Sequence, residues 1–283
     1  MSADPKLPTW EDAVVWLRNQ PDRRQTVMDA FYDDPLAAAA ARYHASAEWQ
    51  AISALLRGRS GAALDIGAGR GITSFALAKD GFAVTALEPD PSVIVGAAAI
   101  RSLAHEASLP INVVEDFSER LPFADAAFDV VVARAVLHHT SDLKGACREI
   151  HRVLKSGGIF VAAREHVISK EADLGKFLDR HPLHHVYGGE HAFLLADYVG
   201  ALKGAGFSLD ILMPLRSPIN LYPYTFDSLR NATVQSLSRR FPLPVWRFLL
   251  KSDLIFSALL AGAERFDNRP GRLYSFVGRK AAA

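Results

Sequence analysis

The stretch ALDIGAGRGITS, residues 63–74, contains three glycines at alternate positions: Gly67, Gly69 and Gly71. The first glycine can adopt the positive φ that a sharp turn from a strand into a helix requires. The other two lack a Cβ, so a ligand can approach the backbone closely at the start of the following helix. Glu88 follows 23 residues after Asp65, near the spacing of about 20 residues at which an acid accepts hydrogen bonds from a ribose. The pattern predicts a turn that binds a nucleoside.

The kind of nucleoside ligand follows from two further residues. Ile72 occupies the position at which the dinucleotide pattern G-x-G-x-x-G requires its third glycine, so the turn does not match that pattern. Asp65 adds a carboxylate beside the loop, which disfavours a pyrophosphate and favours a ligand that carries an ammonium or a sulfonium. We therefore predict S-adenosylmethionine rather than NAD as the ligand. The structural alternative is a glycine turn that serves only close packing.

Histidines supply candidate proton acceptors further along the chain. His138 and His139 follow a predicted strand in ARAVLHHT, and His166 follows the next one in REHVI. The segment HPLHHVYGGEH, residues 181–191, adds four more histidines. We select His139, His166 and His185 as candidates for a general base, which methyl transfer to a hydroxyl requires.

Other roles for these histidines stay open. The adjacent pair after the strand is equally consistent with packing, in which backbone groups satisfy one imidazole. Histidine and carboxylate side chains are also suitable metal ligands. Their spacing here does not match a standard zinc pattern, so we predict no metal ion. The histidine-rich segment is expected to be a substrate loop, and a merely solvated loop is its alternative.

The candidate ligand-binding residues and several of the candidate bases follow predicted strands. From residue 61 onward, short apolar runs alternate with helical segments, as in AALDI, FAVTALE, INVVE, AFDVVVARA and IFVAARE. Runs without polar alternation are typical of strands buried on both faces, and their alternation with helices indicates right-handed βαβ units. We predict an α/β fold with a doubly wound, mostly parallel, Rossmann-like sheet. Ligands of such sheets bind beyond the carboxyl ends of the strands.

Four segments together resemble the class I S-adenosylmethionine-dependent methyltransferases, in the subgroup that acts on small molecules. They are LDIGAGRG, ALEPD, LPFADAAFDVVVARAVLHH and EIHRVLKSGG, within residues 61–165. The resemblance implies a seven-stranded sheet whose last strand is antiparallel, and RLYSFVGRK suits that strand. The residues that the family places around its cofactor are Asp65, Gly67 and Gly69 at the methionine part, Glu88 at the ribose, and Pro89 and Asp90 at the adenine.

Phe117 departs from the family pattern. The family usually carries an acid four residues before the leucine of LPF, where it accepts a hydrogen bond from the adenine amino group. Here Phe117 occupies this position, and Asp116 lies directly upstream. Either Asp116 takes over the bond, or Phe117 and the backbone hold the adenine by packing. Arg134, at the end of a predicted strand, is expected to meet the cofactor carboxylate or the substrate, and a structural ion pair is its alternative.

Composition and charge restrict the class of protein. The 283 residues carry a formal net charge of +1 and no block of lysine or arginine, which argues against a nucleic-acid partner. The single cysteine, Cys147, excludes an internal disulfide and suits a reducing compartment. The N-terminal stretch lacks the apolar core of a signal peptide. Three charged residues in the apolar segment 245–263 argue against a membrane span. We expect a cytoplasmic protein.

We expect one α/β domain with helical additions. The predicted parts are an N-terminal helical cap (1–58) and a methyltransferase domain (59–283), which includes a substrate loop (167–193) and a lid insertion (216–271). Tyr43 and Trp49 of the cap are expected to cover the cofactor pocket. The aromatic residues of the insertion either grip a substrate or form the small core of a helical subdomain.

The function that the sequence favours is O-methylation of a small molecule, a glycan or a secondary metabolite. Two alternatives stay open at this point. One is an NAD-type oxidoreductase or epimerase on a similar fold, and the other is a non-catalytic protein that binds the cofactor. The sequence identifies neither the methyl acceptor nor the oligomeric state.

Overall fold

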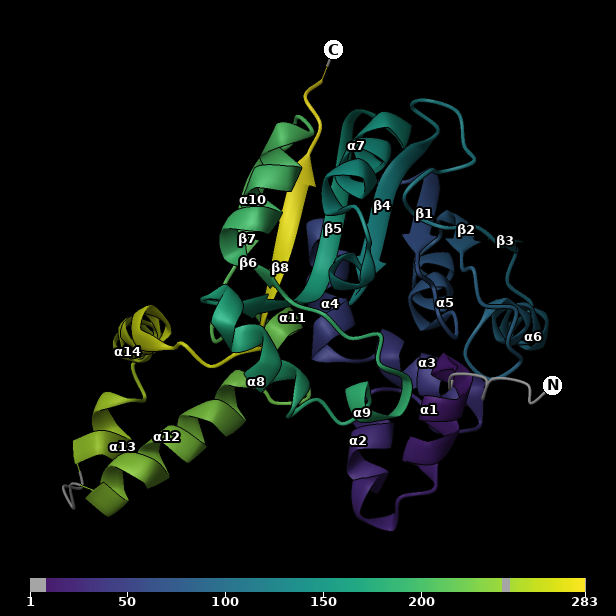
Figure 1. The fold of residues 1–283 in the computed structure, drawn as a ribbon. Coiled ribbons are helices and arrows are strands. Elements are labelled where there is room, and N and C mark those ends of the chain that lie inside the picture. The colour runs from purple at the N-terminus through teal and green to yellow at the C-terminus, as the bar shows by residue number, and fades with distance from the viewer. Residues whose placement is uncertain (1–8, 241–244, 283) are drawn as a thin grey trace.

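The computed structural model describes residues 9–240 and 245–282. Its centre is a sheet in which seven strands follow the order β3-β2-β1-β4-β5-β8-β7, and β6 pairs with β5 (Figure 1). The strands are β1 (Ala62–Ile66), β2 (Ala83–Leu87), β3 (Ile111–Val114), β4 (Phe128–Arg134), β5 (Leu154–Ile168), β6 (Phe193–Leu194), β7 (Ser208–Leu212) and β8 (Arg272–Arg279).

The pairing of the strands shows how the sheet is built. Neighbours from β3 through β5 pair in parallel, and β8 pairs antiparallel with both β5 and β7. This arrangement confirms the predicted α/β fold, including the antiparallel strand at the C-terminal end of the chain. The two-residue strand β6 is an addition that the sequence analysis did not predict.

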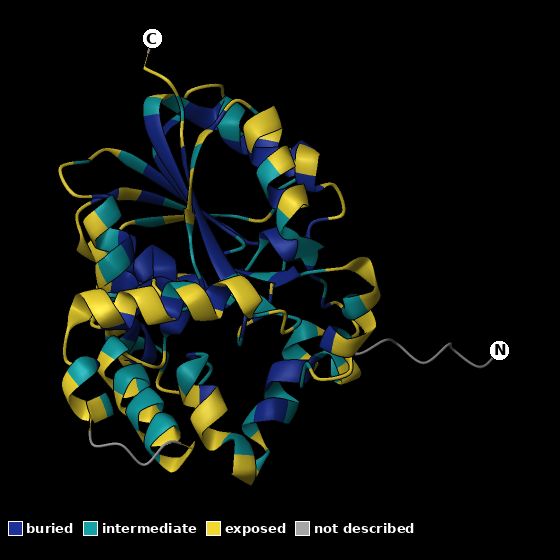
Figure 2. Cartoon of the chain, turned by 90° about the vertical axis from the view of Figure 1, so that its left-hand side faces the viewer, coloured by how far each residue is buried: buried dark blue, intermediate teal, exposed yellow. Residues whose placement is uncertain are grey.

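Helices cover both faces of the sheet, so the central strand β4 buries apolar side chains on each face. Val130 and Val132 of β4 pack into one core cluster, and Val131 and Ala133 pack into the other, because successive side chains of a strand point to opposite faces. Figure 2 shows the buried strands at the centre of the molecule. Helices of the first face are α3 (Leu36–His44), α4 (Ala47–Leu55), α5 (Ile72–Lys79) and α6 (Ala97–Ala107); those of the second are α7 (Leu143–Val153) and α10 (Leu195–Gly204).

The described N-terminal residues form four α-helices, of which α1 (Trp10–Arg18) and α2 (Arg24–Asp29) precede α3 and α4. Thr9 and Asp12 form a capping box at the start of α1. Tyr43 and Trp49 are fully buried in the core between α3, α4 and the sheet. The expectation that these two aromatic residues cover the pocket is therefore wrong, because both side chains are buried between the helices and the sheet.

The histidine-rich segment is more ordered than its sequence suggests. Strand β5 continues to Ile168, and α8 (Leu174–Leu178) and α9 (His184–Tyr187) follow where the sequence analysis expected a loop. Phe177 packs with Ile168 in a small apolar cluster. Helices of four or five residues are too short to show an apolar period, so this local order could not be predicted.

The insertion between β7 and β8 contains α11 (Pro218–Leu221), α12 (Phe226–Arg240), α13 (Val245–Leu249) and α14 (Asp253–Phe266). Leu250, Phe256 and Leu260 are buried against α12 and form a small helical core, which was the alternative to a substrate grip by the aromatic residues of this insertion. In Figure 1, α12 to α14 extend away from the sheet. No helix in the described part of the chain is long and apolar enough to cross a membrane.

Candidate active site

A cavity of about 750 Å³ lies at the carboxyl edge of the sheet. The loops after β1, β2, β3 and β4 line it, together with the end of β5, in agreement with the site expected for an open α/β sheet. Its opposite wall comes from the N-terminal helices and from the histidine-rich segment. Side chains of that wall include Trp10, Leu17, Tyr32, Leu183 and Tyr187.

The three glycines after β1 have different local roles. Gly67 has a φ of 61°, and a Cβ there would lie 2.7 Å from Cγ2 of Val136. Gly69 lines the cavity with a φ of 54°, and a Cβ there would meet no protein atom closer than 4.0 Å. Gly71 is the left-handed N-cap of α5 and packs on Ile100, away from the cavity lining. Gly69 therefore leaves space open in the cavity, whereas Gly71 serves the turn and its packing. The predicted contact between Gly71 and the cofactor stays a prediction.

Glu88 is oriented toward the glycine loop by two backbone groups. The N–H of Gly69 donates to its Oε2 at 2.7 Å, and the N–H of Asp90 donates to its Oε1 at 2.9 Å. Burial raises the pKa of this carboxyl to about 7. Glu88, Pro89 and Asp90 all line the cavity. The structure thus presents a fixed carboxylate to a ligand, as a ribose-binding acid requires.

Asp65 does not line the cavity. Its carboxylate is buried and accepts a hydrogen bond of 2.6 Å from the hydroxyl of Ser74, and burial raises its pKa to about 7. The bond joins the end of β1 to α5, so Asp65 fixes the turn from within. The expected contact between Asp65 and the methionine part of the cofactor stays a prediction.

Asp116 and Phe117 both line the cavity after β3. Oδ1 of Asp116 accepts the N–H of Phe117 at 2.8 Å, and the ring of Phe117 is 66% exposed. Either residue is available to an adenine at this wall. Their roles stay predictions.

Arg134 forms a buried ion pair with Glu48 of α4. Its Nε and Nη2 donate to the two carboxylate oxygens at 2.6 and 3.1 Å. Arg164 of β5 places a second guanidinium 3.7 Å from the same carboxylate. The structure thus shows the ion pair that was the alternative role of Arg134. Arg134 also lines the cavity, and its contact with a cofactor or substrate stays a prediction. The sequence analysis missed Glu48, whose only signal is an acid among the apolar residues of AEWQAI.

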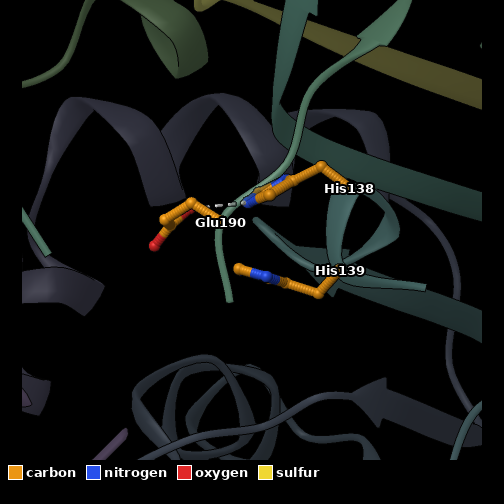
Figure 3. Close-up of side chains that lie close together, drawn as sticks. All are labelled: His138, His139 and Glu190. Carbon is orange, nitrogen blue, oxygen red and sulfur yellow. Dashed lines mark ion pairs between the residues drawn. The ribbon is translucent and has the colours of Figure 1, made fainter. Parts of the chain in front are cut away.

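His138 is held between two carboxylates. Its Nδ1 lies 2.7 Å from Oε2 of Glu165, which also accepts the backbone N–H groups that follow β4. Its Nε2 faces Glu190 at 4.0 Å (Figure 3). Burial lowers the pKa of this imidazole well below its ordinary value. His138 is thus a fixed, buried group in the cavity wall.

His139 and His166 line the same cavity. Nδ1 of His139 donates to the carbonyl of Gly189 at 3.0 Å, which leaves Nε2 with its lone pair, and the side chain is exposed. Nδ1 of His166 donates to the carbonyl of Gly271 at 3.2 Å. Burial lowers the pKa of His166 well below its ordinary value. Both residues lie where the sequence analysis placed them, at the functional edge of the sheet.

His185 lies outside the cavity lining. Helix α9 directs its Nε2 to the carbonyl of Asp179 at 3.0 Å on the exposed surface, which corrects its selection as a base. His181 and Glu190 of the same segment line the cavity instead. The sequence contains these residues but does not indicate which of them face inward.

Aromatic contacts join the two segments that cover the cavity. The ring of Trp10 packs on Tyr187 at 4.8 Å and on Tyr32 at 5.9 Å between centroids. Among the described residues of the insertion, Pro223 alone lines the cavity. The cover therefore comes from α1, α2 and the segment around α9.

Comparisons with known proteins agree with this geometry. Residues 64–162 match the model of a methyltransferase domain family. The chain is 37% identical over 100 residues to a ubiquinone biosynthesis O-methyltransferase of Methylobacterium sp. (strain 4-46), a match that covers 35% of this chain and 39% of that protein. It is 32% identical over 124 residues to the uncharacterized methyltransferase YcgJ of Bacillus subtilis, with 41% and 45% covered. Each match spans less than half of the relative.

Solved structures share the fold over a longer part of the chain. The crystal structure of YcgJ from Bacillus subtilis matches 85% of this chain and 100% of its own with a TM-score of 0.53 and 21% identity. Phosphoethanolamine N-methyltransferase 2 of Haemonchus contortus, in complex with S-adenosyl-L-methionine, matches 95% of this chain and 60% of its own with a TM-score of 0.54 and 18% identity. At these identities the likeness shows a shared fold.

Proposed function

We propose, from the premise that residues 64–162 form a class I S-adenosylmethionine-dependent methyltransferase domain, that the chain methylates a hydroxyl oxygen of a small molecule. One observation carries the proposal: a single cavity joins the glycine loop and Glu88 to the exposed imidazole of His139. A ribose-binding acid and a base thus face the same space. The relatives named as ubiquinone biosynthesis O-methyltransferases support oxygen as the accepting atom.

The cofactor end of the cavity fits S-adenosylmethionine. Gly69 leaves the backbone open to close approach, and Glu88 presents fixed carboxylate oxygens to the ribose hydroxyls. Pro89, Asp116 and Phe117 border the space for the adenine. The bound cofactor supplies an electrophilic methyl group on a sulfonium. The chain's contribution is to hold both reactants in line and to exclude water.

His139 is the proposed general base. Its Nδ1–H is held by the Gly189 carbonyl, so its free Nε2 accepts the hydroxyl proton of the acceptor. The acceptor oxygen bonds to the methyl carbon as the carbon–sulfur bond breaks, and the electron pair of that bond stays on sulfur. His166 faces the same cavity, but burial lowers the pKa of its imidazole well below the ordinary value, which disfavours it as a proton acceptor.

Calorimetry and a turnover assay test the proposal. We expect S-adenosylmethionine and its demethylated product to bind with one site per chain, and NAD to show no binding. Transfer of a labelled methyl group is then measured across hydroxylated acceptors. His139→Gln should lower turnover about 100-fold or more. His105→Gln, an exposed histidine on α6, is the matched control and should leave turnover unchanged.

The possible outcomes separate the parts of this proposal. Failure of both sulfur compounds to bind would overturn it entirely. Binding without turnover on any acceptor would favour a non-catalytic cofactor-binding protein. Equal turnover in the His139 and His105 variants would remove His139 from the base role and leave the methyl transfer intact.

A further inference from the structure

Glu190 is a buried carboxylate surrounded by histidines. Its side chain is 3% exposed, and it lies 3.6 Å from Nδ1 of His181 and 4.0 Å from Nε2 of His138. Two overlapping sets of three residues share it: His166 and His181 form one set with Glu190, and His138 and His139 form the other (Figure 3). In each set the three potential ligand atoms lie within 4.8 Å of one another.

His181, which belongs to the first set, has a ring nitrogen without a hydrogen-bond partner in the described chain. Nδ1 of His181 is inaccessible to solvent and has no hydrogen-bond partner within the described chain. A buried polar atom without a partner costs free energy, so such atoms normally bind something. The atom faces Oε1 of Glu190 at a distance too long for a hydrogen bond. An ion between the two would give Nδ1 of His181 the partner that it lacks.

The other two residues of this set are oriented as metal ligands usually are. Nδ1 of His166 donates to the carbonyl of Gly271 at 3.2 Å, which leaves the lone pair of Nε2 free. The hydroxyl of Tyr187 donates to Oε1 of Glu190 at 2.9 Å and holds the carboxylate. Metal-binding imidazoles and carboxylates typically have such supporting hydrogen bonds.

We propose that His166, His181 and Glu190 bind one divalent transition-metal ion. Two imidazoles and one carboxylate form the ligand set of catalytic zinc sites and of non-haem iron sites, which keep positions open for other ligands. The three residues come from β5, from the loop after α8 and from the loop after α9, so a short sequence motif does not reveal them. The sequence-based prediction of no metal ion rested on that missing motif.

The site would open onto the cavity, because all three residues line it. This step rests on the proposed function. If the chain methylates a hydroxyl, the position of the ion indicates an acceptor whose hydroxyl oxygen coordinates it. Coordination lowers the pKa of a bound hydroxyl, so the proton passes more readily to His139. The acceptor class is then a hydroxylated molecule with an oxygen that is free to coordinate.

The test measures metal binding by the full chain, prepared without a polyhistidine tag and freed of metal with EDTA. Zn²⁺ alone is titrated by calorimetry, and we expect one ion per wild-type chain. Glu190→Gln and His181→Gln should each lower the affinity at least about 100-fold. His185→Gln is the matched control, since His185 lies in the same segment but outside the cavity. It should bind Zn²⁺ as the wild type does.

Three results would overturn this assignment. They are the absence of Zn²⁺ binding by the wild type, wild-type affinity in His181→Gln, and loss of binding in His139→Gln while His181→Gln retains it. Thermal unfolding of each metal-free variant shows whether it folds. Should Glu190→Gln fail to fold, His181→Gln carries the test, because the side chain of His181 is partly exposed.

Cofactor titration of the metal-free protein separates this inference from the proposed function. S-adenosylmethionine binding without Zn²⁺ binding overturns the metal site and leaves the proposed function standing. Zn²⁺ binding without cofactor binding overturns the proposed function and leaves the metal site standing.

Discussion

At the scale of single residues, Glu88 links cofactor binding to pH. Burial raises its pKa to about 7, and the ionised form is the better acceptor for ribose hydroxyls. At pH 6 only about a tenth of the free protein carries the ionised carboxylate. Affinity for S-adenosylmethionine should therefore rise with pH, by about tenfold between pH 6 and pH 8.

Calorimetry across this range checks the prediction, with Glu88→Gln as the control. The variant should bind more weakly at pH 8, and the rise in its affinity from pH 6 to pH 8 should be smaller than that of the wild type. A wild-type affinity that stays constant between pH 6 and pH 8 would contradict the role given to the carboxylate.

Gly67 and Gly69 form a matched pair with different expected defects. Gly67→Ala combines a positive φ with a contact of 2.7 Å to Val136, so it should lower the free energy of unfolding by about 1–3 kcal/mol. Gly69→Ala also strains the backbone, but its methyl group meets no protein atom closer than 4.0 Å and enters the cavity.

The two alanine variants are compared by urea unfolding and by cofactor titration. Gly69→Ala should have the larger free energy of unfolding of the two variants. Its loss of cofactor affinity should nevertheless be greater than its loss of stability would explain. Equal loss of cofactor affinity in both variants would show that the glycines act only through the turn.

At the scale of elements, Glu48 ties α4 to the ends of β4 and β5. Removing its charge would leave Arg134 and Arg164 without their buried counter-ion. Breaking a buried pair of this kind costs about 3–5 kcal/mol, so Glu48→Gln should lower the free energy of unfolding by that amount. Asp125→Asn, which breaks the exposed pair with Arg152, should cost about 0–1 kcal/mol. Urea unfolding of both variants measures the difference, and equal losses would contradict it.

The elements differ in how far the sequence predicts them. Strands β1 to β4 are recognisable because each is a short, mainly apolar run, and a parallel sheet buries both of its faces. Helices α8 and α9 are not recognisable, because helices of five and four residues are too short to show the apolar periodicity of a helix. The partner of Arg134 lies 86 residues away in the sequence, and only the packing of α4 on the strand ends brings it close. The fold alone also decides which residues of the histidine-rich segment face the cavity. The sequence analysis therefore selected the exposed His185 and not Glu190 or His181.

At the scale of the whole molecule, the cavity is closed by segments far apart in the chain. Trp10 of α1 packs on Tyr187 of α9, and both rings line the cavity. Neither α1 nor α9 belongs to the sheet, so their contact can break without disturbing the core. Such covers commonly open to admit ligands and close to exclude water. We infer that α1, α2 and the segment around α9 are the moving parts.

Hydrogen exchange with and without the demethylated cofactor tests this inference. Bound ligand should increase protection of backbone amides in residues 10–32 and 181–190, because it adds contacts to both walls. Helix α14 packs in its own small core outside the cavity, so its protection should stay unchanged and serves as the internal control. Trp10→Ala should weaken cofactor binding about tenfold and reduce the gain in protection. A gain confined to the glycine loop, with none in residues 10–32, would show that the N-terminal helices are a fixed wall.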